Sequence, residues 1–220
     1  MLLLAIDTSG KDGSIALANC HADDCEIIGV APLDGGAFSA QLVPQIAALL
    51  KTRGIAKKDI DAFAATSGPG SFTGLRVGLA AVKALAEVLN KPIAAVSLLE
   101  AIAASSTQKQ VLAAMDAGRK EVYVREHHGS ESLLNADEFL AAAKGQLVVT
   151  ADKSIADLAR NAGLNVEEVS RPRSDAIARL GWKKIRSGET VSAEALDANY
   201  LRRSDQIFAK SINQKLETGN

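Results

Sequence analysis

A glycine-rich stretch at residues 66–78 constrains this chain more than any other part of the sequence. It reads Thr-Ser-Gly-Pro-Gly-Ser-Phe-Thr-Gly-Leu-Arg-Val-Gly. The apolar run at residues 60–65 predicts a short buried strand before it, and apolar residues recur at helical spacing after it, up to Leu89. The chain therefore passes from a strand through a tight turn into a helix, which indicates an α/β protein.

The turn has features of an anion site. Gly68 and Gly70 flank Pro69 and let the backbone turn sharply, and Ser71 or Thr73 can cap the helix that follows. A helix N-terminus presents free amides and the positive end of its dipole to an anion. The Walker lysine and the Rossmann glycine spacing are absent. Phosphate binding and a turn that only allows close packing both stay open.

Two consecutive predicted helices have apolar or small-residue faces that could contact another helix or a partner protein. The helix at residues 73–90 has mostly small residues at i, i+4, i+7 and i+11, namely Gly74, Gly78, Ala81 and Leu85. Each helical glycine costs roughly 1 kcal/mol relative to alanine, so close approach of another backbone is expected to offset it. The helix at residues 39–53 has an apolar face of Leu42, Ile46, Leu49 and Leu50. An internal contact and a subunit interface both stay open.

Composition indicates a folded protein inside the cell. Of 220 residues, 47% are hydrophobic and 23% are charged. No apolar run reaches the ~20 residues of a membrane helix, and Asp7 comes too early for a signal peptide. The only cysteines, Cys20 and Cys25, are too few for a disulfide framework and fit a reducing compartment. We expect a cytoplasmic protein without membrane contact.

Metal and RNA sites are weakly supported by the sequence. A structural zinc site needs four ligands, and the adjacent His127 and His128 would point to opposite faces of a strand, so no metal site is predicted. Residues 171–215 hold 10 Lys/Arg against 5 Asp/Glu. This basic part can be an RNA or acidic-partner surface, with Arg202 and Arg203 as candidate RNA contacts, or an ordinary solvated surface.

The order of elements predicts two related lobes. The first has the order βββαβαβ of an RNase-H-like half, with its elements expected at residues 2–7, 14–18, 26–32, 39–53, 60–65, 73–90 and 92–96. Residues 111–124 repeat the plan of residues 2–18, so we infer an internal duplication with Asp7 and Asp116 at equivalent strand ends. A shorter second lobe is completed by helices near 136–144, 155–162 and 174–187 and a strand at 146–151. The predicted domains are residues 1–104 and 105–196, with a tail at 197–220.

These motifs resemble the TsaB family, also called YeaZ or Gcp-like, over nearly the whole chain. The carriers are Leu-Ala-Ile-Asp-Thr-Ser at 4–9, the glycine signature at 67–78, Met-Asp-Ala-Gly-Arg at 115–119 with Glu-Val-Tyr at 121–123, and Asn-Tyr-Leu-Arg at 199–202. The glycine signature is the most specific of these. The resemblance implies an α/β fold of the actin-like ATPase (ASKHA) type, with two RNase-H-like lobes whose mixed sheets are flanked by helices.

The resemblance also implies a function. TsaB proteins are non-catalytic partners of the related subunit TsaD, which transfers a threonylcarbamoyl group to an adenosine beside the tRNA anticodon. A TsaE ATPase joins this complex, tRNA is reached through it, and TsaB proteins also self-associate through the face that meets TsaD. The two helices at 39–53 and 73–90 would form this face. Its candidate contacts are Leu42, Ile46, Leu49, Gly74, Gly78, Ala81 and Leu85.

Two departures bear on catalysis. Catalytic relatives carry metal-binding histidines on the first helix, where this chain has Phe-Ser-Ala-Gln at 38–41, and the second lobe lacks a glycine-rich phosphate loop after Asp116. We expect no catalytic residue and no required cofactor, while ATP or ADP in the complex stays open. The candidate nucleotide or phosphate residues are Asp7, Ser9, Gly68, Gly70, Ser71 and Asp116.

Three functional classes remain for comparison. The favoured one is an interaction subunit that activates a larger related enzyme. The second is a stand-alone ATPase or phosphotransferase that uses Asp7 and Asp116, although a carboxylate at a strand end is often only a turn or cap. A protease function is not supported, because the chain contains neither a His-Glu-x-x-His nor a Gly-x-Ser-x-Gly stretch. The third class is an RNA-binding module.

Overall fold

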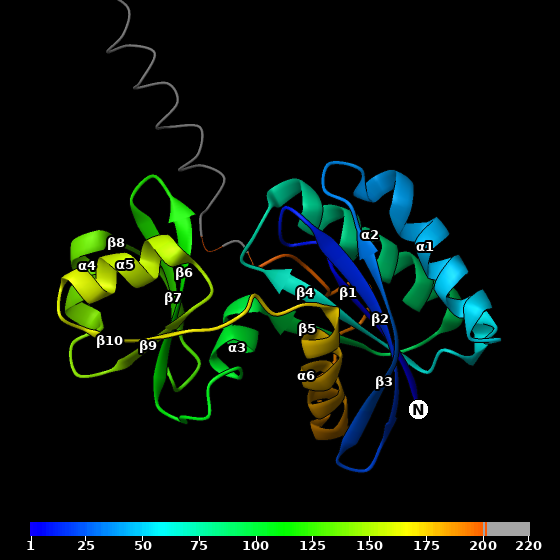
Figure 1. The fold of residues 1–220 in the computed structure, drawn as a ribbon. Helices are drawn as coiled ribbons and strands as arrows, with labels where there is room; N and C mark the ends of the chain where they lie inside the picture. The colour runs from blue at the N-terminus through cyan, green and yellow to red at the C-terminus, as the bar shows by residue number, and fades with distance from the viewer. Residues whose placement is uncertain (200, 202–220) are drawn as a thin grey trace, which may run out of the picture.

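The computed structural model describes residues 1–199 and 201, which form two lobes (Figure 1). The first lobe contains the strands β1 (Leu2–Asp7), β2 (Gly13–His21), β3 (Asp24–Leu33), β4 (Ala62–Gly68) and β5 (Ile93–Ser97). The second contains β6 (Val111–Gly118), β7 (Glu121–Arg125), β8 (Glu131–Asn135), β9 (Leu147–Thr150) and β10 (Asn165–Glu168). The helices are α1 (Phe38–Thr52), α2 (Phe72–Leu89), α3 (Leu98–Ala103), α4 (Ala136–Ala142), α5 (Lys153–Asn161) and α6 (Ser174–Ser187).

The two sheets have the same topology. The first has the strand order β3-β2-β1-β4-β5, and the second has the corresponding order β8-β7-β6-β9-β10. In each sheet the central strand is antiparallel to the next strand and parallel to the fourth. Asp7 accepts a hydrogen bond from the amide of Ser9, and Asp116 accepts one from the amide of Gly118, two residues on in both cases. The predicted α/β duplication with mixed sheets is confirmed.

Helices cover both faces of each sheet. Helices α1 and α2 pack on one face of the first sheet, where Leu42, Leu75 and Phe63 belong to the same buried cluster. Helices α4 and α5 cover one face of the second sheet through Phe139 and Ile155. The apolar spacing that predicted these helices faces the core in each case.

The remaining two helices cross between the lobes. Helix α6 follows the last strand of the second sheet but packs on the first sheet, with Ile177, Ala178 and Trp182 in the cluster of Ala64 (Figure 1). Helix α3 follows the last strand of the first sheet but packs beside Met115 of the second. The expectation that the helix at residues 174–187 completes the second lobe is therefore wrong, because this helix packs on the first sheet.

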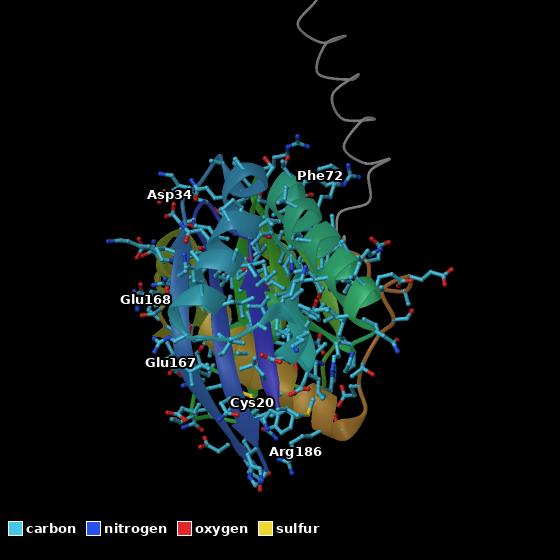
Figure 2. All side chains as sticks on the ribbon, turned by 90° about the vertical axis from the view of Figure 1, so that its right-hand side faces the viewer. Cys20, Asp34, Phe72, Glu167, Glu168 and Arg186 are labelled. Atoms are coloured by element: carbon cyan, nitrogen blue, oxygen red, sulfur yellow. A yellow bond between two sulfur atoms is a disulfide. The ribbon has the colours of Figure 1, made fainter. Side chains whose placement is uncertain are left out.

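The two cysteines lie in the first lobe. Cys20 of β2 and Cys25 of β3 are cross-strand partners and form a disulfide (Figure 2). From the sequence, the two cysteines are too few for a disulfide framework and fit a reducing compartment, so this bond was not predicted. No helix in the described part of the chain is long and apolar enough to cross a membrane.

Candidate functional site

A cavity of about 560 Å³ lies where the two lobes meet. The first lobe contributes the turn after β1 and the glycine loop before α2, and the second lobe contributes the end of β6. Four of the six candidate nucleotide residues line this cavity, namely Ser9, Gly70, Ser71 and Asp116. The fold therefore brings together residues that lie far apart in the sequence. Nucleotide binding by them stays a prediction.

Asp7 and Gly68 do not line this cavity. The Asp7 side chain is only 3% exposed, and its Oδ1 accepts hydrogen bonds from the backbone amide of Ser9 at 3.0 Å and the Ser9 hydroxyl at 2.7 Å. Its visible role is to close the turn after β1. Gly68 has a φ of +127°, and a Cβ atom there would lie 2.9 Å from the carbonyl oxygen of Asn199. Glycine is needed because the C-terminal segment passes so close to it.

The glycine loop is held against the turn after β1. The amide of Ser71 donates to the carbonyl oxygen of Ser9 at 2.7 Å, and the Ser71 hydroxyl accepts from the amide of Gly74 at 3.3 Å, which caps α2. A Cβ at Gly70 would lie 2.8 Å from that of Ser9. The amides of Ser71 and Gly74 are thus already bonded within the chain. Phosphate binding at this loop stays a prediction.

The two carboxylates of the cavity also have bonds within the chain. Asp116 accepts from the amide of Gly118 at 2.7 Å and from the hydroxyl of Ser154 at 3.3 Å. Asp152 accepts from the amide of Asp116 at 2.8 Å. Both side chains therefore organise the loops at this end of the second sheet.

Three cations surround the same cavity. They are Lys11, Arg76 and Arg171. The guanidinium of Arg76 stacks on the ring of Phe72, 3.8 Å from its centre, and Nη2 of Arg171 donates to the Ser9 hydroxyl at 3.4 Å. The buried Nε of Arg171 has no hydrogen-bond partner among the described residues. No sequence motif predicted these cations as a group, because they come from three separate segments.

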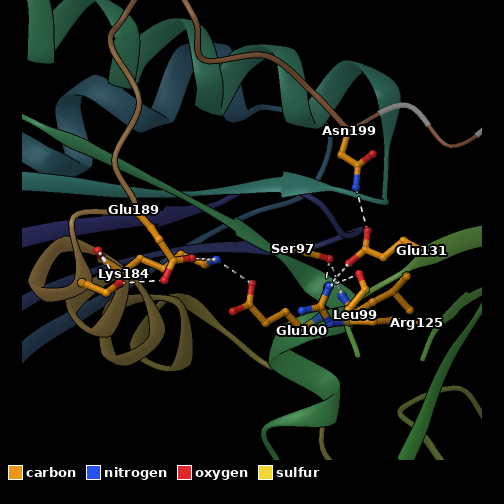
Figure 3. A network of polar contacts seen from close by, with 10 residues as sticks. Ser97, Leu99, Glu100, Arg125, Glu131, Lys184, Glu189 and Asn199 are labelled. Atoms are coloured by element: carbon orange, nitrogen blue, oxygen red, sulfur yellow. Dashed lines mark hydrogen bonds and ion pairs between the residues drawn. The ribbon is translucent and has the colours of Figure 1, made fainter. Parts of the chain in front are cut away.

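A polar network joins the lobes near the cavity (Figure 3). The amide of Asn199 donates to the carbonyl oxygen of Ser67 at 2.7 Å, and the Asn199 side chain donates to Glu131 of β8 at 2.7 Å. Arg125 pairs with the same carboxylate at 3.0 Å. The C-terminal segment is therefore fixed to both lobes at once. No sequence signal predicted this role for Asn199 or Glu131.

A second part of this network connects α3 to α6. Lys184 pairs with Glu100 at 3.2 Å and with Glu189 at 3.5 Å. A hydrogen bond from the Ser187 hydroxyl, followed by the charge of Lys184, lowers the pKa of the exposed Glu189 carboxyl. The two helices that cross between the lobes are thus linked to each other as well as to the sheets.

The predicted partner contacts are mostly inside the chain. Gly74 and Gly78 pack against Thr8, whose hydroxyl donates to the carbonyl oxygen of Gly74 at 2.8 Å. The small-residue stripe is therefore an internal contact, and its interpretation as an interface is corrected for both glycines. Three further predicted contacts, Leu42, Ile46 and Leu49, are buried in the core of the first lobe. Of the predicted set, only Ala81 and Leu85 are partly exposed.

The same two helices nevertheless present an apolar surface on their other side. This outer helix face consists of Ala40, Val43 and Ala47 of α1 and Val77, Ala80, Ala84 and Val88 of α2. Val43 is 62% exposed and Val88 is 81% exposed. The helices lie side by side in Figure 2 and contact each other. An exposed apolar surface is typical of a protein interaction site.

The basic residues of α6 are largely paired within the chain. Arg179 pairs with Asp175, Lys184 pairs with Glu100, and Arg186 pairs with Asp23. The candidate RNA contacts Arg202 and Arg203 lie outside the described residues. Within residues 1–199 and 201, no group of three or more His, Cys, Asp or Glu side chains is placed to hold a metal ion.

Comparison with known proteins gives consistent results. The family model "TsaD: tRNA N6-adenosine threonylcarbamoyltransferase" matches residues 22–216. The "tRNA threonylcarbamoyladenosine biosynthesis protein TsaB" of Escherichia coli (strain K12) is 29% identical over 92% of this chain and 95% of its own length. The protein of the same name from Bacillus subtilis (strain 168) is 29% identical over 92% of this chain and 94% of its own.

A solved structure supports the same assignment. "YeaZ from Pseudomonas aeruginosa" aligns with a TM-score of 0.72 and 25% identity over 91% of this chain and 99% of its own. This match confirms the predicted actin-like fold of two RNase-H-like lobes. The chain therefore belongs to the family described by the TsaD model, and within it to the TsaB (YeaZ, Gcp-like) group.

Proposed function

We propose that this chain is a non-catalytic activating subunit of the machinery that synthesises threonylcarbamoyladenosine in tRNA. It binds a TsaD-like enzyme through the outer helix face. The observation that carries this proposal is the exposed apolar surface of α1 and α2, with Val43 and Val88 mostly open to solvent. The names of the E. coli and B. subtilis relatives support the pathway, since both are described as tRNA threonylcarbamoyladenosine biosynthesis proteins.

The state of the polar groups at the cavity favours a supporting role over catalysis. A stand-alone ATPase or phosphotransferase would need carboxylates and loop amides available to a phosphate or a magnesium ion. Here Asp7 and Asp116 bond to the chain's own amides, and the Ser71 amide bonds to Ser9. Their geometry is that of turn closure. The subunit therefore acts by contact with the enzyme and not by chemistry of its own.

The fold shared with a TsaD-like partner suggests how the two proteins bind each other. Because the TsaD family model matches this chain, a TsaD-like partner has related lobes, and equivalent helices on the two proteins can pair about a pseudo-twofold axis. The same geometry allows two copies of this chain to pair when the enzyme is absent. A TsaE-like ATPase and the tRNA substrate join through the complex, which works in the cytoplasm.

The proposal is tested by reconstitution. The cognate TsaD-like enzyme is assayed for threonylcarbamoyl transfer to tRNA with and without this chain. We expect transfer to require the wild-type chain and to be lost when Ala84→Glu replaces it, because the new charge would be buried in an apolar contact. Alanine and glutamate are both good helix formers, so α2 should remain folded.

The matched control is Ala141→Glu, which makes the same change at an exposed helical alanine of α4 in the second lobe. This variant should support transfer as well as the wild-type chain does. Full activity of the enzyme without this chain, or transfer of the group by this chain alone, would overturn the proposal.

A second candidate function is binding of ATP or ADP in the interlobe cavity. The observation in its favour is the set of three cations, among them Arg171 with its unpartnered Nε. Calorimetry of the full chain with ATP and with ADP tests it directly. Binding that is lost in Arg171→Ala would support it, and the absence of heat with either nucleotide would exclude it.

A further inference from the structure

We propose that Cys20 and Cys25 are a reversible redox site whose oxidation fixes the β2–β3 hairpin against α6. The pair belongs to neither the interlobe cavity nor the outer helix face, and it goes beyond the proposed function. Its reaction partner is a low-molecular-weight disulfide or the corresponding thiol.

The backbone places the two cysteines as a close cross-strand pair. They are directly opposite in the β2–β3 register, with Cα atoms 4.1 Å apart. The amide of Cys20 donates to the carbonyl oxygen of Met1, and its own carbonyl oxygen accepts from the N-terminal amine of Met1. Because both groups face β1, Cys20 and Cys25 are a non-hydrogen-bonded pair, the type in which opposite side chains approach most closely. The backbone register therefore holds the two cysteines face to face.

The hairpin tip between the cysteines is where α6 is docked. The indole of Trp182 donates to the carbonyl oxygen of Ala22 at 3.1 Å, and Arg186 pairs with Asp23. The sulfur of Cys25 lies 3.9 Å from the carbonyl oxygen of Ala178, so the reduced thiol can donate a weak hydrogen bond to it. Three successive turns of α6 thus contact residues 22–25. A covalent bond across the base of this tip holds those contacts in place.

Helix α6 carries the effect toward the centre of the molecule. At its other end, the amide of Ser174 donates to the hydroxyl of Ser14 at 3.1 Å, and Arg171 just before it contacts Ser9 at the cavity. Both cysteines, Ala178 and Trp182 belong to one buried cluster. Oxidation or reduction of the pair is therefore expected to change how stably α6 packs along the whole first lobe.

The reaction is ordinary thiol–disulfide exchange. Cys25 is 8% exposed against 1% for Cys20, so the proposal assigns it as the cysteine that reacts first. Its thiolate attacks one sulfur of the external disulfide and releases one thiol molecule, which leaves a mixed disulfide. Cys20 then attacks the Cys25 sulfur and releases the second thiol molecule. Two protein thiols and one external disulfide become one protein disulfide and two external thiols, so atoms and electrons balance.

The chain carries its own reporters for this reaction. It has only two cysteines and one tryptophan, so the number of alkylated thiols describes this pair alone and the fluorescence describes Trp182 alone. The full chain is equilibrated in mixtures of reduced and oxidised glutathione, alkylated and weighed by mass spectrometry. We expect the number of free thiols to fall from two to none as the mixture becomes oxidising, and to return to two with reductant. Trp182 emission should change in parallel.

The variant Cys20→Ser/Cys25→Ser should show no redox dependence of Trp182 emission, and the pair Cys20→Ala/Cys25→Ala serves if serine disturbs folding. Hydrogen exchange of α6 should be faster in the reduced wild-type chain than in the oxidised one. Three results would overturn the proposal: thiols that resist oxidised glutathione, a glutathione adduct that never resolves to the internal bond, or full oxidation without any change in Trp182 or α6. None of these depends on the TsaD-like partner.

Discussion

Gly70, Gly74 and Gly78 are fixed by what they touch at the end of β1. The missing side chain of Gly70 leaves room for Ser9, and those of Gly74 and Gly78 leave room for Thr8. The glycine signature thus joins α2 to the end of the central strand of the first lobe. The contacts are with backbone oxygens at Gly70 and Gly74 and with the Thr8 hydroxyl at Gly78, and they leave no space for a methyl group. Its conspicuous composition is explained by packing inside one chain.

Gly74→Ala tests this explanation. The added methyl group would collide with the carbonyl oxygen of Thr8, which belongs to the backbone and cannot rotate away. We expect unfolding free energy to fall by about 3 kcal/mol, the upper end for overpacking of a core. Urea unfolding followed by circular dichroism measures it.

The control is Gly145→Ala, where φ is +76° and no atom lies within 4 Å of the added carbon. It should cost only about 1 kcal/mol, the conformational penalty for alanine at a glycine position. If Gly74→Ala is as mild as this control, close packing does not explain the signature.

Residue patterns predicted close approach here but could not name the neighbour. A stripe of small residues at helical spacing looks the same whether a strand of the same lobe or another subunit lies against it. The bonds of Asn199 to Ser67 and Glu131 had no signal at all, because those residues follow no common period. Asp7 and Asp116 were placed correctly at equivalent strand ends, since the repeated strand–Asp–turn plan is local.

The elements themselves follow closely from the sequence where they are apolar. Helices α1, α2 and α6 begin and end within one or two residues of the predicted ranges. Strands β8 and β10 were missed because Glu131–Asn135 and Asn165–Glu168 are short, polar edge strands without clear alternation. The lobe assignment of α6 was missed for a different reason. Its apolar stripe predicts that the helix packs on a sheet, but the stripe does not identify which of the two sheets.

The crossing helices make a prediction about folding. A fragment of residues 1–104 contains the whole first sheet but lacks α6, so the sheet face formed by Ala5, Ala64 and Ala94 would be open to water. Helix α3 would lose its sheet as well. We expect this fragment to show no cooperative unfolding transition, whereas a chain ending at residue 201 should retain one.

Calorimetry or chemical denaturation of the two fragments decides the point. An autonomously folded 1–104 fragment with a sharp transition would contradict the interdependence of the lobes, because it would mean that α6 is dispensable for the first sheet.

The whole molecule combines a tightly connected body with one open apolar surface. The lobes are joined by the two crossing helices, by the Asn199–Glu131 bond and by the Lys184–Glu100 pair. The cavity groups are engaged in holding this body together. The outer helix face, in contrast, is exposed within the described residues except at the half-buried Val77. The proposed supporting role requires such a division between a scaffold and a docking surface.

The affinity for the cognate TsaD-like enzyme tests this account most directly. Isothermal titration of the enzyme with the wild-type chain, Ala84→Glu and Ala141→Glu should give tight binding for the wild type and the Ala141 variant. Ala84→Glu should bind at least roughly tenfold more weakly, a loss of about 1.4 kcal/mol or more. Equal affinities for all three proteins, with α2 intact by circular dichroism, would contradict the central claim that the outer helix face is the partner surface.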